Sequence, residues 1–242
     1  MSAGLFPYCL AAFVLGGAGM YAGSLHAEPE RKQQRWQKFA GYFVITNAVL
    51  LIAAMGRSIL AGFAAAVVCV GAQELFTALG SARELGDIAR AGIWAGYATC
   101  GSGLVLFSLV TAGGEIQFAY LIVAVFDGFS QVCGQLFGSK PLAPSISPSK
   151  TVEGALGGAL FAAGFAAVVR GLQNGDVERA LVFSAAIVPA ALAGDLAGSW
   201  IKRRAGIKDF SSALPGQGGV LDRFGSFLFA ATVAVLIPRV RT

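Results

Sequence analysis

The sequence predicts an all-α, polytopic integral membrane protein with about eight transmembrane helices, and two observations support this prediction. Only 13% of the 242 residues are charged, about half of the ~25% usual in soluble domains, whereas 56% are hydrophobic. The charged residues also occur in clusters, and the apolar gaps between them are close to the ~20 residues with which a helix crosses a bilayer. Both observations exclude a soluble globular domain.

The gaps define the spans in order along the chain. Four spans fall within residues 1–115, at 1–27, 39–56, 58–82 and 91–114. Four more fall within residues 116–242, at 116–139, 154–169, 180–201 and 224–238. The spans at 154–169 and 224–238 are short, and we expect the long side chains of the flanking Arg170 and Arg239 to reach the interface. The long polar connections are 139–153 and 202–223.

The distribution of basic residues predicts the orientation. If the N-terminus is outside and eight spans alternate, 13 of the 18 Lys and Arg residues fall on the inside and five on the outside. Cytoplasmic loops carry such an excess, so we expect both long connections to be cytoplasmic. The net charge of +5 then reflects orientation and attraction to anionic headgroups or phosphates. The sequence contains no basic helix with interleaved aromatic residues, the pattern that would indicate a nucleic-acid partner.

Several kinds of catalytic site are excluded by residue type. The chain has one histidine, and its four cysteines all lie in apolar spans without a CxxC pair. A histidine-based triad or a zinc site cannot be assembled from these residues. Lys150-Thr151 lacks the glycine that a Walker A loop requires.

Three spans contain a single acid, and a carboxylate in a membrane helix is costly enough to suggest a role. Glu74 lies near the cytoplasmic end of its span, where an interhelical hydrogen bond is a sufficient explanation. Asp127 lies deeper and is followed by Ser130 and Gln131, which predicts a polar intramembrane site between helices.

Asp195 belongs to a longer polar pattern. Asp195, Ser199 and Lys202 are spaced i, i+4 and i+7, so they share one stripe of a helix. Such a stripe is suited to hold Mg²⁺ on the carboxylate while the hydroxyl and the ammonium bind phosphate oxygens. The alternative is a simple Asp–Lys pair at a helix end.

The loop that follows strengthens the phosphate interpretation. Residues 202–208 contain four basic residues, and the glycine-rich segment 214–219 then predicts an elbow before Asp222 and Arg223. An elbow that turns back brings Asp222 beside Asp195. Two acids among Lys and Arg favour a nucleoside triphosphate with Mg²⁺, which binds one or two carboxylates together with substrate phosphates.

The loop at 139–153 supplies a second set of polar residues. Ser147, Lys150 and Thr151 come just before a predicted helix, whose N-terminal amides can bind anions. The two hydroxyl groups are also suitable as helix caps.

The segment GDLAGSWIKRRAGIKDFSSALPGQGGVLDR at 194–223 closely resembles a motif of the membrane-bound phosphatidate cytidylyltransferases, the CDP-diacylglycerol synthases. In that family GDLxxSxxKR leads through KD and PGHGG to DRxD. The loop GQLFGSKPLAPSISPSKTVEGALGG at 134–158 is similar to the family's other motif, and Asp127 matches an acid at the same spacing. The resemblance covers about residues 126–226.

The resemblance implies that the chain makes CDP-diacylglycerol and pyrophosphate from CTP and phosphatidate, in phospholipid biosynthesis. It implies that Asp195 and Asp222 bind Mg²⁺, with a second cation also expected. Phosphate or headgroup binding is implied for Ser199, Lys202, Arg203, Lys208 and Arg223, with Asp209 orienting the basic loop. Ser147, Lys150 and Thr151 would bind nucleotide or lipid phosphate. Residues 116–242 then form the catalytic region, in a bacterial inner membrane with the site facing the cytoplasm, in a protein that we expect to form a homodimer.

The chain departs from the family pattern at three places, and at one of them Ser130-Gln131 replaces the common Ala-Tyr. Gln217 stands where the motif has His, and Gly225 stands where the last Asp of DRxD belongs. The loss of that acid is expected to weaken a second cation site.

Two other functions are compatible with the residues. A CTP-dependent kinase of a polyprenol-type lipid would also use CTP and a membrane lipid, but it would transfer the γ-phosphoryl group and release CDP. A cation-coupled transporter would use Asp127 and Asp195 as intramembrane sites, although most motif residues lie in loops on one face.

Overall fold

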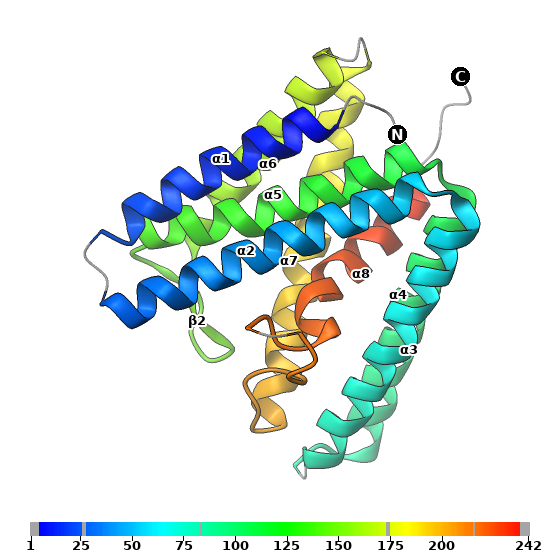
Figure 1. Ribbon diagram of the computed structural model, residues 1–242. Helices are drawn as coiled ribbons and strands as arrows, with labels where there is room; N and C mark the ends of the chain where they lie inside the picture. The colour runs from blue at the N-terminus through cyan, green and yellow to red at the C-terminus, as the bar shows by residue number, and fades with distance from the viewer. Residues whose placement is uncertain (1–4, 26–27, 83, 173–174, 215, 238–242) are drawn as a thin grey trace.

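The computed structural model describes residues 5–25, 28–82, 84–172, 175–214 and 216–237, which form eight helices and one hairpin (Figure 1). Pro215 of the elbow and three bases of the charge count, Arg83, Arg239 and Arg241, lie outside the described residues. The elements are, in chain order, α1 (Phe6–Gly23), α2 (Pro29–Ala54), α3 (Arg57–Ser81), α4 (Asp87–Val110), α5 (Gly113–Phe137), β1 (Pro141–Ala143), β2 (Ser147–Thr151), α6 (Val152–Leu172), α7 (Val177–Arg204) and α8 (Val220–Leu236).

The helices confirm the predicted fold class. Among the described residues, seven helices, α1 to α7, are long and apolar enough to cross a membrane. The eighth, α8, has 17 residues, or roughly 26 Å at 1.5 Å per residue, so the count of eight spans is approximate. The protein is therefore an all-α integral membrane protein.

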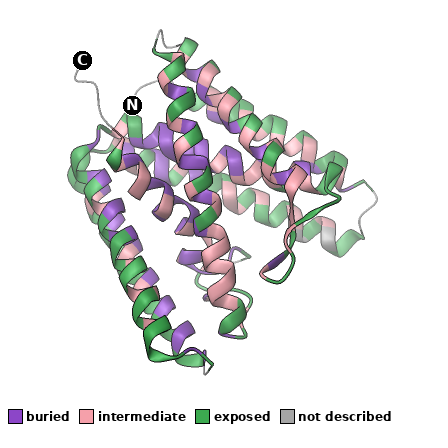
Figure 2. Ribbon diagram, turned by 180° about the vertical axis from the view of Figure 1, so that it is seen from behind, coloured by how far each residue is buried: buried purple, intermediate pink, exposed green. Residues whose placement is uncertain are grey.

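Helix α5 is the centre of the bundle. Twelve of its residues are buried, compared with two in α1, because α5 packs against α1, α2, α6, α7 and α8. Apolar side chains on the outer helices remain exposed on their outward faces (Figure 2), as expected for surfaces that meet lipid. The outer helices α3 and α4 pack against each other and against α8.

The connection between α5 and α6 is more ordered than the loop that the sequence predicted. β1 and β2 pair antiparallel, with Pro141 opposite Thr151 and Ala143 opposite Ser147. The Ile146 N–H donates to the Ala143 carbonyl at 3.1 Å and closes the turn. The hairpin contacts α5, α6 and α7, so it fixes residues 147–151 against the helices.

The fold brings one end of each of several helices to a common cavity. The cavity is lined by residues along most of α1, by the middle and C-terminal parts of α5 and α7, and by the N-terminal parts of α2, α6 and α8. The C-terminal ends of α1, α5 and α7 and the N-terminal ends of α2, α6 and α8 are those that the charge distribution predicts to be cytoplasmic.

Candidate active site

The candidate site is a cavity of about 610 Å³, which is within the usual range for small-molecule sites. Its lining is largely polar at β2, α7 and α8, largely apolar at α1, and mixed at α2 and α5. Among the residues that the sequence singled out, the cavity is lined by Asp127, Lys150, Thr151, Asp195, Asp222 and Arg223.

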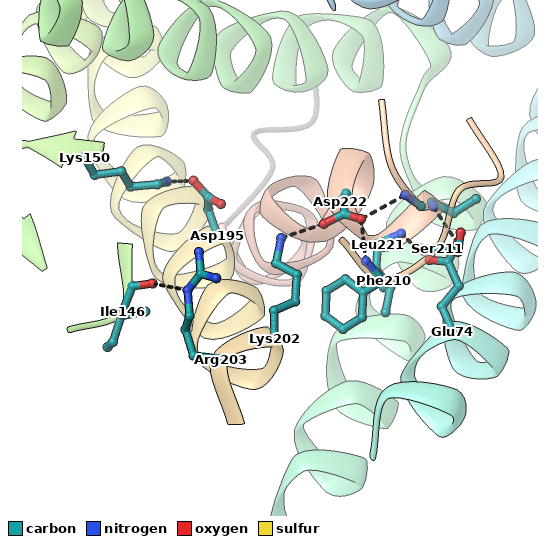
Figure 3. Close-up of polar contacts among 12 residues, drawn as sticks. Glu74, Ile146, Lys150, Asp195, Lys202, Arg203, Phe210, Ser211, Leu221 and Asp222 are labelled. Carbon is teal, nitrogen blue, oxygen red and sulfur yellow. Dashed lines mark hydrogen bonds and ion pairs between the residues drawn. The ribbon is translucent and has the colours of Figure 1, made fainter. Parts of the chain in front are cut away.

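Asp195 lies on α7 and forms an ion pair with Lys150 of β2 (Figure 3). The two residues are 45 positions apart, and the β1–β2 hairpin brings the ammonium to the carboxylate. The Asp195 side chain is 36% exposed, so its carboxylate is accessible to a ligand in the cavity. An acid and a base that meet at the wall of a cavity are suited to bind a cation and a phosphate side by side.

Asp222 is the third residue of α8 and is much more enclosed, with its side chain 2% exposed. Its Oδ1 accepts the Lys202 ammonium at 2.6 Å. Its Oδ2 accepts the backbone N–H groups of Phe210 and Gly219, each at 2.8 Å. A carboxylate in the first turn of a helix is also stabilised by the helix dipole. Asp222 therefore joins the basic loop, the elbow and α8 at one point (Figure 3).

The predicted stripe on α7 spans two ion pairs. Asp195 pairs with Lys150 and Lys202 pairs with Asp222, so the stripe is not a simple helix-end Asp–Lys pair. Ser199, between them in sequence, is partly buried and does not line the cavity. The face of α7 thereby connects the β1–β2 hairpin to α8.

Lys150 has an electrostatic environment that suits an anion site. Burial lowers the pKa of the Lys150 ammonium below its usual value, while the nearby Asp127 carboxylate raises it and the Lys202 ammonium lowers it further. A phosphate group between Lys150 and Lys202 would relieve their mutual repulsion. The arrangement therefore favours a polyanionic ligand.

Glu74 holds the elbow in place. This buried carboxylate of α3 accepts the Ser211 hydroxyl at 2.6 Å and the N–H groups of Val220 and Leu221 at 2.9 and 2.8 Å. Glu74 was predicted to make a structural hydrogen bond between helices. Its partners are the first two residues of α8 and Ser211, which lie on either side of the elbow. The unpaired amides at a helix N-terminus are the groups that such a carboxylate satisfies.

Gln217 connects the elbow to α2. Its Nε2 donates to the Lys38 carbonyl at 2.8 Å, across 179 positions, and its side chain lies against Gly41. Two glycines, Gly216 and Gly218, have φ values of +70° and +85°, which form the predicted tight elbow. The buried Oε1 of Gln217 and Nε of Arg223 have no hydrogen-bond partner among the described residues.

Several other predicted residues, Lys202 among them, do not line the cavity. Ser147 is buried at the start of β2, and Arg203 donates from Nε to the Ile146 carbonyl at 3.3 Å. Lys208 and Asp209 are exposed and do not line the cavity. Thr151 lines the cavity, and its Oγ1 accepts the Gly154 N–H at 3.1 Å, the capping role that its position also suggested.

Helices α1 and α2 also line the cavity, a contribution that was not predicted from the sequence. Helix α2 lines the cavity with Arg35, Lys38, Phe39 and Tyr42. Their i, i+3, i+4 and i+7 spacing is visible in the sequence and indicates a shared face. The sequence does not indicate that this face is turned toward residues 195–223.

The acids at the cavity suit a cation that shares its coordination with phosphates. Among the residues that the structure describes, no three His, Cys, Asp or Glu side chains form a cluster that could hold a metal ion. Mg²⁺ is commonly bound by only one or two carboxylates, with substrate phosphates and water completing its coordination. Asp195 and Asp222 supply that number, and the lysines paired with them can turn to phosphate oxygens.

The fold and the cavity define a class: a polytopic membrane protein with a cavity between its helices that is lined by acidic, basic and apolar residues. The chain belongs to the cytidylyltransferase family, whose model matches residues 112–240, about half of the sequence. The matched range contains both acids and both lysines of the ion pairs.

Proteins named phosphatidate cytidylyltransferase are similar to this chain. One from Aquifex aeolicus is 41% identical over 128 residues, which are 51% of this chain and 48% of the relative. One from Helicobacter pylori is 42% identical over 129 residues, or 52% and 48% of the two chains. One from Haemophilus influenzae is 36% identical over 121 residues, or 48% and 42%. The chain spans about half the length of the curated relatives it matches.

Proposed function

We propose that this chain transfers the cytidylyl group of CTP to phosphatidate and forms CDP-diacylglycerol and pyrophosphate. The observation that carries the proposal is a set of two ion pairs, Lys150–Asp195 and Lys202–Asp222, in a cytidylyltransferase-family membrane protein. Lys150 and both acids line one cavity, and Lys202 reaches it through its contact with Asp222. The names of the relatives supply the substrate class.

The proposed reaction requires little acid–base chemistry. A phosphate oxygen of phosphatidate attacks the α-phosphorus of CTP, the new P–O bond forms, and the bond to the β-phosphate breaks with release of pyrophosphate. The attacking phosphate is already an anion, so no strong general base is needed. The main barriers are repulsion between anions and alignment of the attack.

Residues of this chain are suited to lower both barriers. Lys150 at the cavity and Lys202 beside Asp222 would neutralise phosphate oxygens, and the buried Nε of Arg223 offers a further donor at the cavity. Glu74 and Gln217 would keep the elbow, and with it Asp222, fixed relative to α7. Fixed donors are more effective than mobile ones because no reorganisation is needed during the reaction.

We infer that Asp195 and Asp222 hold Mg²⁺ when CTP is bound. The cation would supply charge neutralisation and alignment of the triphosphate. The accessible Asp195 carboxylate can bind directly, whereas Asp222 already accepts three donors and would exchange that of Lys202. We also infer an inner-membrane location with the cavity toward the cytoplasm, because the excess of Lys and Arg falls on that side.

The test is a product assay on the purified protein in detergent with phosphatidate, Mg²⁺ and CTP labelled at the α-phosphate. The expected product is labelled CDP-diacylglycerol, with loss of activity for Asp195→Asn and Asp222→Asn. A lipid kinase would instead release labelled CDP, so the same assay separates the two reactions. Absence of any labelled lipid from wild-type protein, with phosphatidates of several chain lengths, would refute the proposal.

A further inference from the structure

The inner face of α2 carries a combination of cationic and aromatic groups that the proposed function has not used. Arg35, Lys38, Phe39 and Tyr42 lie on one stripe of α2 and line the cavity. The stripe lies outside residues 112–240, the range that the family model matches. It therefore adds residues to the site that the motifs do not contain.

The apolar part of the cavity lies beside this stripe. Helix α1 contributes Cys9, Phe13, Gly16 and Met20, among others, and both α1 and α2 pack on α5 (Figure 1). The Phe13 ring meets the Phe39 ring edge to face, with centroids 5.5 Å apart. The cavity therefore joins an apolar region between three membrane helices to the polar wall at α7 and α8.

The two cations of the stripe have different surroundings. Arg35 donates from Nη1 to the Gly23 carbonyl at 2.9 Å and to the Ser24 hydroxyl at 3.2 Å, so it fixes the end of α1 to α2. The Lys38 side chain is exposed, and its ammonium has no hydrogen-bond or ion-pair partner within the described parts of the chain. The Lys38 carbonyl accepts a hydrogen bond from Nε2 of Gln217, so the elbow contacts the α2 backbone at this residue.

We propose that Lys38 binds the phosphate of the acceptor lipid, with its acyl chains against the apolar region formed by α1, α2 and α5. The inference rests on the proposed function and names the part of the site that the lipid uses. A nucleotide offers phosphates but no long apolar chain, whereas a lipid phosphomonoester offers both and matches a cavity with one cationic and one apolar region. Arg35 is a positioning residue, because its guanidinium is already bound to the end of α1.

The kinetic test compares Lys38→Ala and Lys38→Arg with Lys32→Ala. Lys32 is on the same helix, outside the cavity, with its ammonium over the Tyr21 ring at 5.6 Å. We expect Lys38→Ala to raise the KM for phosphatidate about tenfold, equivalent to about 1.4 kcal/mol of binding free energy, without changing the KM for CTP. Lys38→Arg should retain most of the affinity, and Lys32→Ala should behave as wild type.

A binding test does not depend on turnover. Native mass spectrometry of the purified protein, without CTP, would measure bound phosphatidate against bound diacylglycerol of the same chains. Wild-type protein should prefer phosphatidate, and Lys38→Ala should lose that preference while still binding diacylglycerol. This result would stand even if no CDP-diacylglycerol were formed, in which case the proposed function alone would fail.

Two results would overturn the inference. If Lys38→Ala raises the KM for CTP instead, the lysine serves the nucleotide. If Lys38→Ala keeps both the lipid preference and the KM for phosphatidate, the lysine binds neither substrate. Equal elution of the variants in size-exclusion chromatography would exclude misfolding as a cause.

Discussion

The carboxylate of Glu74 accepts the backbone N–H of Leu221 at 2.8 Å, and the two residues are 147 positions apart. Leu221 is the second residue of α8 and Asp222 is the third. A buried acid of α3 thus holds the turn of α8 that presents Asp222, and Asp222 itself accepts the Gly219 N–H in the same turn. The N–H groups at the N-terminus of α8 are thus bound by two carboxylates, Glu74 of α3 and Asp222 of α8 itself.

Glu74→Gln is expected to lower kcat at least tenfold, because one oxygen becomes an NH₂ group that faces a backbone N–H donor. Loss of a hydrogen bond to a charged group costs about 1.5–3 kcal/mol, so we also expect lower thermal stability. Both are measured on purified protein, by CDP-diacylglycerol formation and by thermal unfolding in detergent. Thr77→Val is the control, since the Thr77 hydroxyl donates only to the Gln73 carbonyl of its own helix, at 3.0 Å.

The two ion pairs are expected to differ in their contribution to stability. Lys202→Met leaves Asp222 without its ammonium at 2% exposure, and breaking a buried pair costs about 3–5 kcal/mol. Lys150→Met leaves Asp195, which is 36% exposed and accessible to water, so its loss should cost about 1 kcal/mol or less. Thermal unfolding in one detergent should show the larger decrease in Tm for Lys202→Met. Equal decreases would mean that burial of Asp222 does not determine the difference.

Gly41→Ala is expected to disturb the contact between α2 and the elbow, because the added methyl group would collide with the Gln217 side chain. We expect lower activity, measured as initial rate of CDP-diacylglycerol formation. The double variant Gly41→Ala with Gln217→Ala should recover part of the activity, since the collision is removed, and the coupling follows from a double-mutant cycle. Gly96→Ala is the control, because nothing lies within 4 Å of an added methyl group there.

An activity of Gly41→Ala equal to that of Gly96→Ala would contradict a tight contact at Gln217. Failure of the double variant to recover would mean that the effect of Gly41 passes through another neighbour.

Much of the fold follows from the sequence alone, because membrane spans are set by the length of apolar gaps between charges. The i, i+7 spacing of Asp195 and Lys202 predicted that they share one face of a helix, and the glycines of 214–219 predicted the elbow. These features depend on residues close together in the chain, where helical and turn geometry are known in advance.

Contacts between residues far apart in the sequence could not be predicted in the same way. Lys150 meets Asp195 because the β1–β2 hairpin turns back on α7, and short strands within a polar loop give little periodic signal. The contact of Glu74 with residues 220 and 221 depends on how α3 packs against α8. The cavity face of α2 likewise depends on packing, since the spacing of Arg35, Lys38, Phe39 and Tyr42 indicates a shared face but not which helices that face meets.

Gly225 of α8 stands where the family motif has Asp. An added Cβ at Gly225 meets nothing within 4 Å, whereas one at Gly194 would collide with the Gly225 carbonyl and the Phe229 ring. We therefore expect Gly225→Asp to fold normally and Gly194→Ala to lose stability in thermal unfolding.

If a carboxylate at 225 strengthens cation binding, Gly225→Asp should reach half-maximal activity at a lower Mg²⁺ concentration than wild type. Gly225→Asn, which has the same size without the charge, should keep the wild-type Mg²⁺ dependence. Identical Mg²⁺ titrations of the Asp and Asn variants would show that position 225 does not affect cation binding in this chain.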